Sequence, residues 1–101
     1  MVKHIILWTL KGDYTNAEKN EIKKEIKKGL EGLSGKIPGL IDIKVQTEHL
    51  SSSNADLMLD SSFESIEALK GYAVHPLHIE VADGKVRPYT ATRSCLDYEI
   101  K

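Results

Sequence analysis

The first apolar segment of the chain runs from position 2 to position 10 and is rich in β-branched and aromatic residues. A turn-forming Lys-Gly-Asp sequence follows it, so the pattern predicts a strand. Side chains alternate along a strand, and apolar residues fall on both faces here: Ile5 and Leu7 on one, and His4, Ile6 and Trp8 on the other. A strand that is apolar on both faces is normally covered on both. The pattern therefore predicts a second layer on each side.

A helical spacing begins after this strand. Thr15 and Glu18 fit a capping box, in which each side chain bonds a free N–H group of the first turn. The apolar residues that follow fall on one stripe of a helix: Ile22, Ile26, Leu30 and Leu33. Lysines and glutamates occupy the opposite side, as on a solvated helix face. We expect a helix from Thr15 to about Leu33.

Two strands are predicted in the middle of the chain. Leu40–His49 alternates apolar and polar residues, which predicts one buried face carrying Ile41, Ile43 and Val45. Ala55–Leu59 is a shorter apolar segment and is the third predicted strand. The serine-rich segment between them is expected to be a loop.

A second helix is expected to start at Ser65, a favourable N-cap residue. It should end near His75, because the residue before a proline avoids helical geometry. Pro76 can then begin a further helical turn as its first residue, and this turn is expected to continue towards Gly84.

Tyr89–Ile100 is the last predicted strand. Alternation divides its side chains between two faces: Leu96, Tyr98 and Ile100 on one, and Cys95, Asp97 and Glu99 on the other. We expect Cys95 to be a small core residue. The order strand, helix, strand, strand, helix, strand predicts an α+β fold of the ferredoxin-like βαββαβ type. In this fold the helices cover one face of a four-stranded antiparallel sheet, so a second copy is the simplest cover for the other face. This predicts a homodimer.

Composition is that of an ordinary single domain spanning residues 1–101. The net charge of −1 provides no basic footprint for nucleic acid. No apolar segment approaches the roughly 20 residues of a membrane span, so no membrane partner is expected. The single cysteine excludes an internal disulfide, and the short apolar start lacks the regions of a signal peptide. The sequence therefore predicts a cytoplasmic protein.

Groups that can transfer protons gather in the segment Tyr72–His78. Tyr72 and His75 are neighbours at i and i+3 on a helix, so His75 is expected to line the same pocket or to orient its groups. If Pro76 is the first residue of a helical turn, His78 lies near the positive end of the helix dipole, which favours its neutral ring. A neutral base and a phenol that donates to an enolate oxygen can together remove a proton beside a carbonyl group.

Other interpretations of these residues stay open. The rings can be packing and capping groups at a helix end. A metal site would use His75 and His78, with His4 as a third ligand, although no cysteine or acidic cluster adjoins them in sequence. His4 shares a strand face with Trp8 and can line a pocket with it. Asp97 can hydrogen-bond His78 and fix its tautomer.

Five segments carry a resemblance to a known family: Val2–Trp8, Ser53–Asp56, Phe63–Ser65, Tyr72–His78 and Asp97–Glu99. Together they resemble the stress-responsive dimeric α/β-barrel family, Dabb, over essentially the whole chain. The His-Pro-x-His core and the Lys-His of the first strand are the most specific parts. The resemblance implies the ferredoxin-like fold derived above and a homodimer whose two sheets pack into a barrel.

The resemblance also implies a function, because plant members include heat-stable stress proteins and a polyketide cyclase. It implies that Tyr72 steadies an oxyanion, that His78 is the base, and that His4 and Asp97 belong to the pocket. Such an enzyme closes a ring by an aldol-type reaction without a cofactor, on a small hydrophobic or aromatic ligand. Trp8 is expected to narrow the space for a long acyl tail.

The alternative is a stress-associated structural or small-molecule-binding protein without turnover. Analogy at the level of the fold adds cofactor-free monooxygenases and haem-degrading enzymes. These would need a cavity large enough for haem or a quinol.

Overall fold

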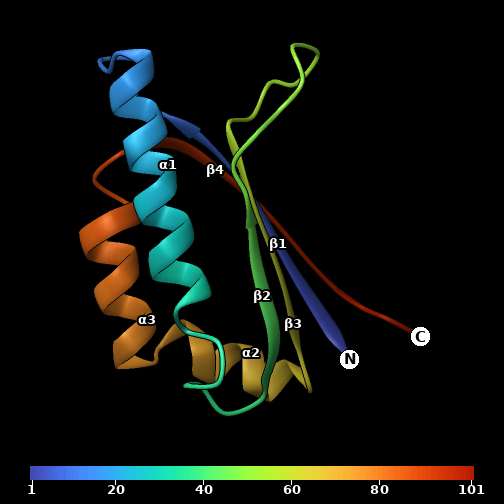
Figure 1. Cartoon of the computed structure of the whole chain (residues 1–101). Coiled ribbons are helices and arrows are strands. Elements are labelled where there is room, and N and C mark those ends of the chain that lie inside the picture. The colour runs from blue at the N-terminus through green and yellow to red at the C-terminus, as the bar shows by residue number, and fades with distance from the viewer.

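The computed structural model describes residues 1–101, which form one sheet and a layer of helices (Figure 1). The elements in chain order are β1 (Val2–Leu10), α1 (Asn16–Glu31), β2 (Leu40–Gln46), β3 (Leu57–Phe63), α2 (Ile66–Ala73), α3 (Pro76–Val81), a π-helical segment η1 (Ala82–Val86) and β4 (Thr90–Glu99). The sheet has the order β2-β3-β1-β4, and all its neighbouring strands are antiparallel. This confirms the predicted ferredoxin-like α+β fold.

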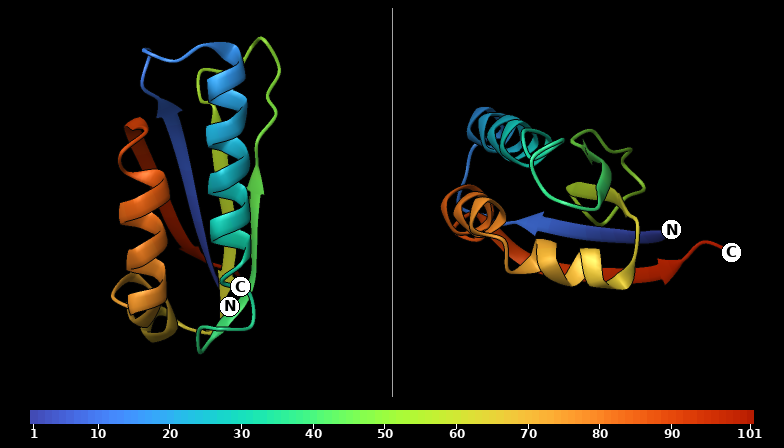
Figure 2. Two further views of the ribbon diagram at one scale, coloured as in Figure 1. Left: turned by 60° about the vertical axis from the view of Figure 1, so that its left-hand side comes forward. Right: turned by 90° about the horizontal axis from the view of Figure 1, so that it is seen from below.

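All the helices lie on one face of the sheet, and the other face is open (Figures 1 and 2). The buried residues of β1 alternate along the strand and face the helices: Val2, His4, Ile6, Trp8 and Leu10. Ile26 and Leu30 of α1 are almost fully buried against this face. Each side chain of this kind contributes about 1.5–3 kcal/mol when it leaves water. The core therefore lies between the sheet and the helices.

The start of α1 has the predicted capping box. Thr15 Oγ1 accepts a hydrogen bond from the Glu18 amide at 3.2 Å, and the Glu18 carboxylate accepts one from the Thr15 amide at 2.9 Å. The predicted N-cap of α2 is also present, since the Ser65 hydroxyl accepts from the Ala68 amide at 3.1 Å. A bilayer crossing would need a longer and more apolar helix than any in this structure.

The third strand is longer than predicted and ends at Phe63 instead of Leu59. Its extension contains two buried serines, which resemble a loop in sequence but are hydrogen-bonded here. Ser61 Oγ donates to the carbonyl oxygen of His4 at 2.9 Å, and Ser62 Oγ accepts from the Lys3 ammonium at 3.1 Å. Buried hydroxyls are tolerated in a strand when they are paired in this way.

The second strand departs from simple alternation at its start. The pairing register of β2 with β3 shifts between Leu40 and Asp42, as in a β-bulge. Ile41 is the extra residue, and its side chain is 49% exposed. The prediction that Ile41 belongs to the buried face was therefore wrong, whereas Ile43 and Val45 are buried as expected.

The last strand is an edge strand, and all its residues after Thr90 are exposed. Cys95 is among them, so the prediction of a core cysteine was wrong. Cys95 pairs with Ile6 in the strand register and therefore faces the helix side. It stays exposed because the helices leave β4 largely uncovered. The open face of the sheet exposes Leu7 at 41% and Leu96 at 63%.

Candidate functional site

A small cavity of about 90 Å³ lies between the sheet and the helical layer. Its apolar walls come from β1, β3, α1 and η1: Ile6, Trp8, Leu30, Leu59, Ala82 and Val86. Its polar groups come from β1, α2, α3, the end of η1 and β4: His4, Tyr72, His78, Arg87, Thr90 and Arg93. Four of the six residues singled out from the sequence therefore line this cavity: His4, Trp8, Tyr72 and His78.

Tyr72 and His78 are in direct ring contact. Their ring centroids are 4.2 Å apart, with planes inclined at 37°. Tyr72 is 1% exposed, and its hydroxyl is buried without a hydrogen-bond partner. Burial raises the pKa of Tyr72, so the hydroxyl keeps its proton. An unpaired buried hydroxyl is costly, and it leaves a donor ready for a ligand oxygen.

His78 is held by the backbone of the preceding helix. Its Nδ1 lies 3.3 Å from the carbonyl oxygen of Ala73. When the Nδ1–H donates to this carbonyl, Nε2 keeps the lone pair of a base. The pKa of His78 is lowered, mainly by burial. The sequence predicted that the neutral ring of His78 would be favoured, and the lowered pKa agrees with this. The main cause is burial, whereas the sequence analysis had expected the dipole of the helix that begins at Pro76.

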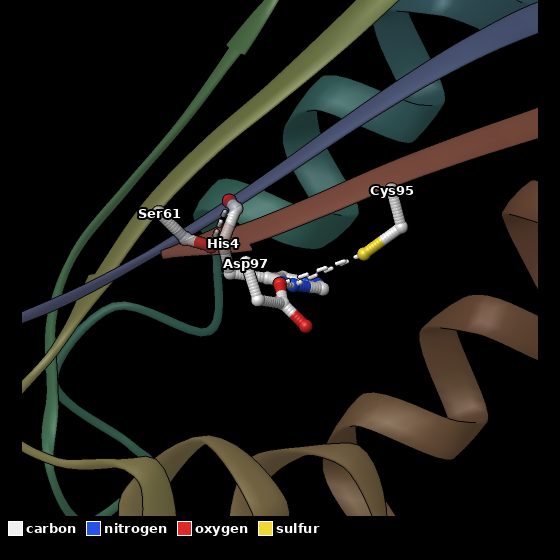
Figure 3. A network of polar contacts seen from close by, with 4 residues as sticks. All are labelled: His4, Ser61, Cys95 and Asp97. Carbon is white, nitrogen blue, oxygen red and sulfur yellow. Dashed lines mark hydrogen bonds and ion pairs between the residues drawn. The ribbon is translucent and has the colours of Figure 1, made fainter. Parts of the chain in front are cut away.

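The sequence suggested that Asp97 fixes the tautomer of His78, but Asp97 has a different partner in the structure. It is paired with His4 across the β1–β4 register, and its carboxylate contacts His4 Nδ1 (Figure 3). The His4 ring is buried and lies 6.1 Å from the Tyr72 ring. Asp97 therefore orients His4, while the Ala73 carbonyl orients His78.

Cys95 extends the His4–Asp97 pair on the helix side of the sheet (Figure 3). Its Sγ lies 3.8 Å from His4 Nδ1 and 3.5 Å from Asp97 Oδ1. Burial and then the Asp97 carboxylate raise the pKa of the Cys95 thiol. Ligand atoms of these three residues all lie within 4.8 Å of one another, and they are donor types that zinc accepts. They are the groups that could hold a metal ion, but only with the thiol deprotonated.

His75 lies outside the cavity that contains Tyr72 and His78. Its Nδ1 accepts from the Leu77 amide at 3.2 Å and so caps α3. It lines a shallow surface hollow beside Gly39 and not the cavity that contains Tyr72. The expectation that His75 joins the pocket was wrong. The alternative metal site of His75, His78 and His4 does not form, because the ligand atoms that converge belong to His4, Cys95 and Asp97.

Sequence reasoning left Arg87 and Arg93 without a role, although both line the cavity. The period of two along β4 was the available signal for Arg93, because it places Arg93 on the same face as Asp97. Arg87 had no such signal, since its position depends on the π-helical segment before it. Larger hollows, of about 370, 400, 470 and 560 Å³, lie elsewhere on the surface and contain no tyrosine–histidine contact.

Proteins of known sequence or structure are similar to this chain. Olivetolic acid cyclase from Cannabis sativa is 29% identical over 85 residues, which are 81% of this chain and 80% of that protein. A dimeric protein of unknown function with a ferredoxin-like fold, from Bacteroides fragilis, has a TM-score of 0.90 and 30% identity. That similarity covers 98% of this chain and 95% of the other.

A hydroxynitrile lyase from Passiflora edulis has a TM-score of 0.74 and 18% identity, over 99% of this chain and 88% of that one. This likeness shows the fold alone. The family model described as the stress responsive A/B barrel domain, Dabb, matches residues 2–100. Because that match spans nearly the whole chain, the protein belongs to the stress responsive A/B barrel domain family.

Proposed function

We propose that this protein is a small cofactor-free enzyme of the cyclase or isomerase kind, which removes a proton beside a carbonyl group. His78 is the base and Tyr72 is the oxyanion donor. The observation that carries the proposal is the ring contact between His78 and a buried Tyr72 whose hydroxyl has no partner. The similarity to olivetolic acid cyclase supports an activity of the cyclase kind.

The two groups have complementary protonation states. His78 has a lowered pKa, so its ring is neutral at neutral pH and can accept a proton at Nε2. Tyr72 has a raised pKa, so its hydroxyl stays protonated and donates to the enolate oxygen that forms. As the substrate loses its proton to His78, negative charge moves to the carbonyl oxygen beside Tyr72.

The cavity favours the smallest of the hydrophobic carbonyl compounds expected as ligands, because its volume is about 90 Å³ and Trp8 forms part of its wall. We also propose that two copies pair through the open face of the sheet. Leu7, Leu96 and Tyr98 are exposed there, and a second sheet would cover them. Similar structures, including the one from Bacteroides fragilis, are described as dimeric.

Proton exchange in D₂O tests the proposed chemistry without knowledge of the natural substrate. The protein is incubated with pyruvate, butanone or acetophenone, and deuterium entering beside the carbonyl is measured by NMR. We expect His78→Gln to slow the catalysed exchange by about 10²–10⁴-fold. Tyr72→Phe should slow it by about 10²–10³-fold, as removal of an oxyanion donor does.

His49→Gln is the matched control, because His49 lies in the loop after β2, away from the cavity. It should exchange protons at the wild-type rate. Exchange no faster than in buffer for every compound, or equal exchange in wild type and the His78 variant, would contradict the proposal.

A non-catalytic role in binding or structure is the second candidate. The specific observation in its favour is that the Tyr72 ring packs edge-on against Phe63, with centroids 5.0 Å apart, in the manner of a core residue. The small cavity also leaves little room for a large substrate such as haem. Ligand binding without proton exchange would favour this role.

A further inference from the structure

We propose that the cavity beside Tyr72 and His78 accepts a small oxo acid, with the carboxylate bound by the guanidinium group of Arg93 and assisted by Arg87. This inference rests on the proposed function, since it names the substrate class of the same site. Arg87 and Arg93 both line the cavity, but the proposed proton transfer gives them no role.

The two arginines reach the cavity from separate elements. Arg93 pairs with Trp8 in the β1–β4 register, so its side chain leaves β4 on the helix side of the sheet. Arg87 follows η1 as its C-cap residue. Both line the cavity and both are exposed, so they mark its solvent-facing end, while the walls inside are apolar.

The positive charge at this end of the cavity is only partly neutralised. None of the cavity-lining residues is an aspartate or a glutamate. Arg93 forms no salt bridge, whereas Arg87 pairs with Asp83 on the surface. Exposed pairs of this kind are weak, so Arg87 can exchange its partner for a ligand carboxylate. Arg93 is available without any exchange.

The charge also acts on the two groups proposed for catalysis. Arg93 opposes the rise in the pKa of Tyr72 that burial causes. Arg87 and Arg93 both add to the lowering of the pKa of His78. A negative ligand group placed beside the guanidinium groups would therefore lie within electrostatic reach of Tyr72 and His78.

Size and shape favour a carboxylic acid with few atoms. A volume of about 90 Å³ is the share of about three molecules of liquid water. The planar guanidinium fork matches a carboxylate in a bidentate way. A ligand whose carboxylate is at Arg93 would place a neighbouring keto group towards the unpaired hydroxyl of Tyr72. A short chain carrying both groups satisfies these constraints.

Binding can be measured through Trp8, which lines the cavity and is the single tryptophan of the chain. Pyruvate and acetoacetate are titrated and the quenching of its fluorescence is followed, with pyruvamide and acetoacetamide as neutral compounds of nearly equal size. We expect each acid to bind at least about tenfold more tightly than its amide, since a charge-assisted hydrogen bond contributes that much. Inorganic phosphate should bind more weakly than the acids.

Arg93→Gln should weaken acid binding by about tenfold and leave amide binding unchanged. Arg87→Gln should have a smaller effect, because this side chain already has a partner in Asp83. Lys28→Gln is the control, since it removes a charge of the same sign from α1 and leaves the cavity unaltered. Circular dichroism and the melting temperature show that each variant is folded.

Equal affinity for acid and amide, unchanged acid binding in the Arg93 variant, or no binding of either acid at millimolar concentration would overturn the inference. If phosphate binds as tightly as the acids, the site binds anions in general and does not select oxo acids. Proton exchange distinguishes this failure from failure of the proposed function. If butanone exchanges its protons but acids are not preferred, the proposed function holds and the oxo acid inference fails. If acids bind but no compound exchanges its protons, the oxo acid inference holds and the proposed function fails.

Discussion

Each face of the sheet carries some side chains of a kind that is unusual for its surroundings. The face covered by helices contains His4, Tyr72 and His78 around a cavity, and the Tyr72 hydroxyl there has no partner. The open face instead exposes apolar side chains such as Leu7 and Leu96. Folding of a single chain explains neither feature. The covered face retains a polar group at a cost, and the open face leaves apolar surface in water.

The difference suggests that each face is completed by a different partner. A ligand oxygen would satisfy the polar group on the covered face, and a second copy of the chain would cover the apolar groups on the open face. The two faces should therefore respond differently to substitution: changes on the open face should affect assembly, whereas changes on the covered face should affect binding and chemistry.

The largest effect is expected for a charge on the open face. Leu96→Asp should raise the dissociation constant of the dimer by at least about a hundredfold, because an unpaired carboxylate would be buried in the interface. His78→Ala, on the covered face, should leave the dimer intact. Sedimentation equilibrium measures both. A wild-type protein that is a stable monomer at micromolar concentration would contradict this assignment of the open face.

Removal of the unpaired hydroxyl should separate stability from activity. Tyr72→Phe should raise the free energy of unfolding by about 1 kcal/mol, because a buried donor without a partner is costly. The same substitution should slow proton exchange. Urea unfolding gives the stability, with Tyr89→Phe as the control for loss of a hydroxyl from a half-buried tyrosine outside the cavity. A fall in stability would mean that the Tyr72 hydroxyl is hydrogen-bonded in solution.

The stability of the protein should depend on the protonation of His78. Its pKa is lower in the folded state than the ordinary value of 6.5. The unfolded chain therefore binds the proton more readily, and stability should fall as pH drops through about 6.5 towards the folded-state pKa. His78→Gln should reduce this dependence. An unchanged pH dependence in this variant would show that His78 does not resist protonation in the folded protein.

The smallest effect is expected for metal removal. A chelator should leave the melting temperature unchanged, because a structural zinc site normally has four protein ligands and only three donor residues converge here. A clear decrease would instead indicate a metal ion at His4, Cys95 and Asp97, whose ligand atoms converge. The Cys95→Ser variant would then lose the chelator response.

Local rules predicted most of the fold. Alternation along β1, the capping box at Thr15 and the start of α3 at Pro76 all follow from short stretches of sequence, and all are confirmed. Features that depend on neighbouring strands were missed. The bulge at Ile41 and the extension of β3 through Ser61 arise from pairing across the sheet, which local patterns do not contain.

The candidate site was predicted only in part, because some of its contacts are local in sequence and others join separate strands. The contact between Tyr72 and His78 joins residues that are close in sequence, and the resemblance to the family already singled them out. The partner of Asp97 lies on a different strand, and the expected bond to His78 was replaced by one to His4. Arg93 was overlooked because its importance comes from the lack of acidic residues around a cavity, which only a structure reveals.

The pH dependence of proton exchange tests the central claim most directly, because it reports the protonation state of the base itself. Exchange into butanone, which carries no charge that could shift the pKa of His78, is measured by NMR from acidic to slightly alkaline pH, with the rate in buffer subtracted. The rate should reach a plateau at high pH and fall by about tenfold per pH unit below a midpoint lower than 6.5. A catalysed rate that does not change with pH, or one with a midpoint above 6.5, would contradict the assignment of His78 as the base.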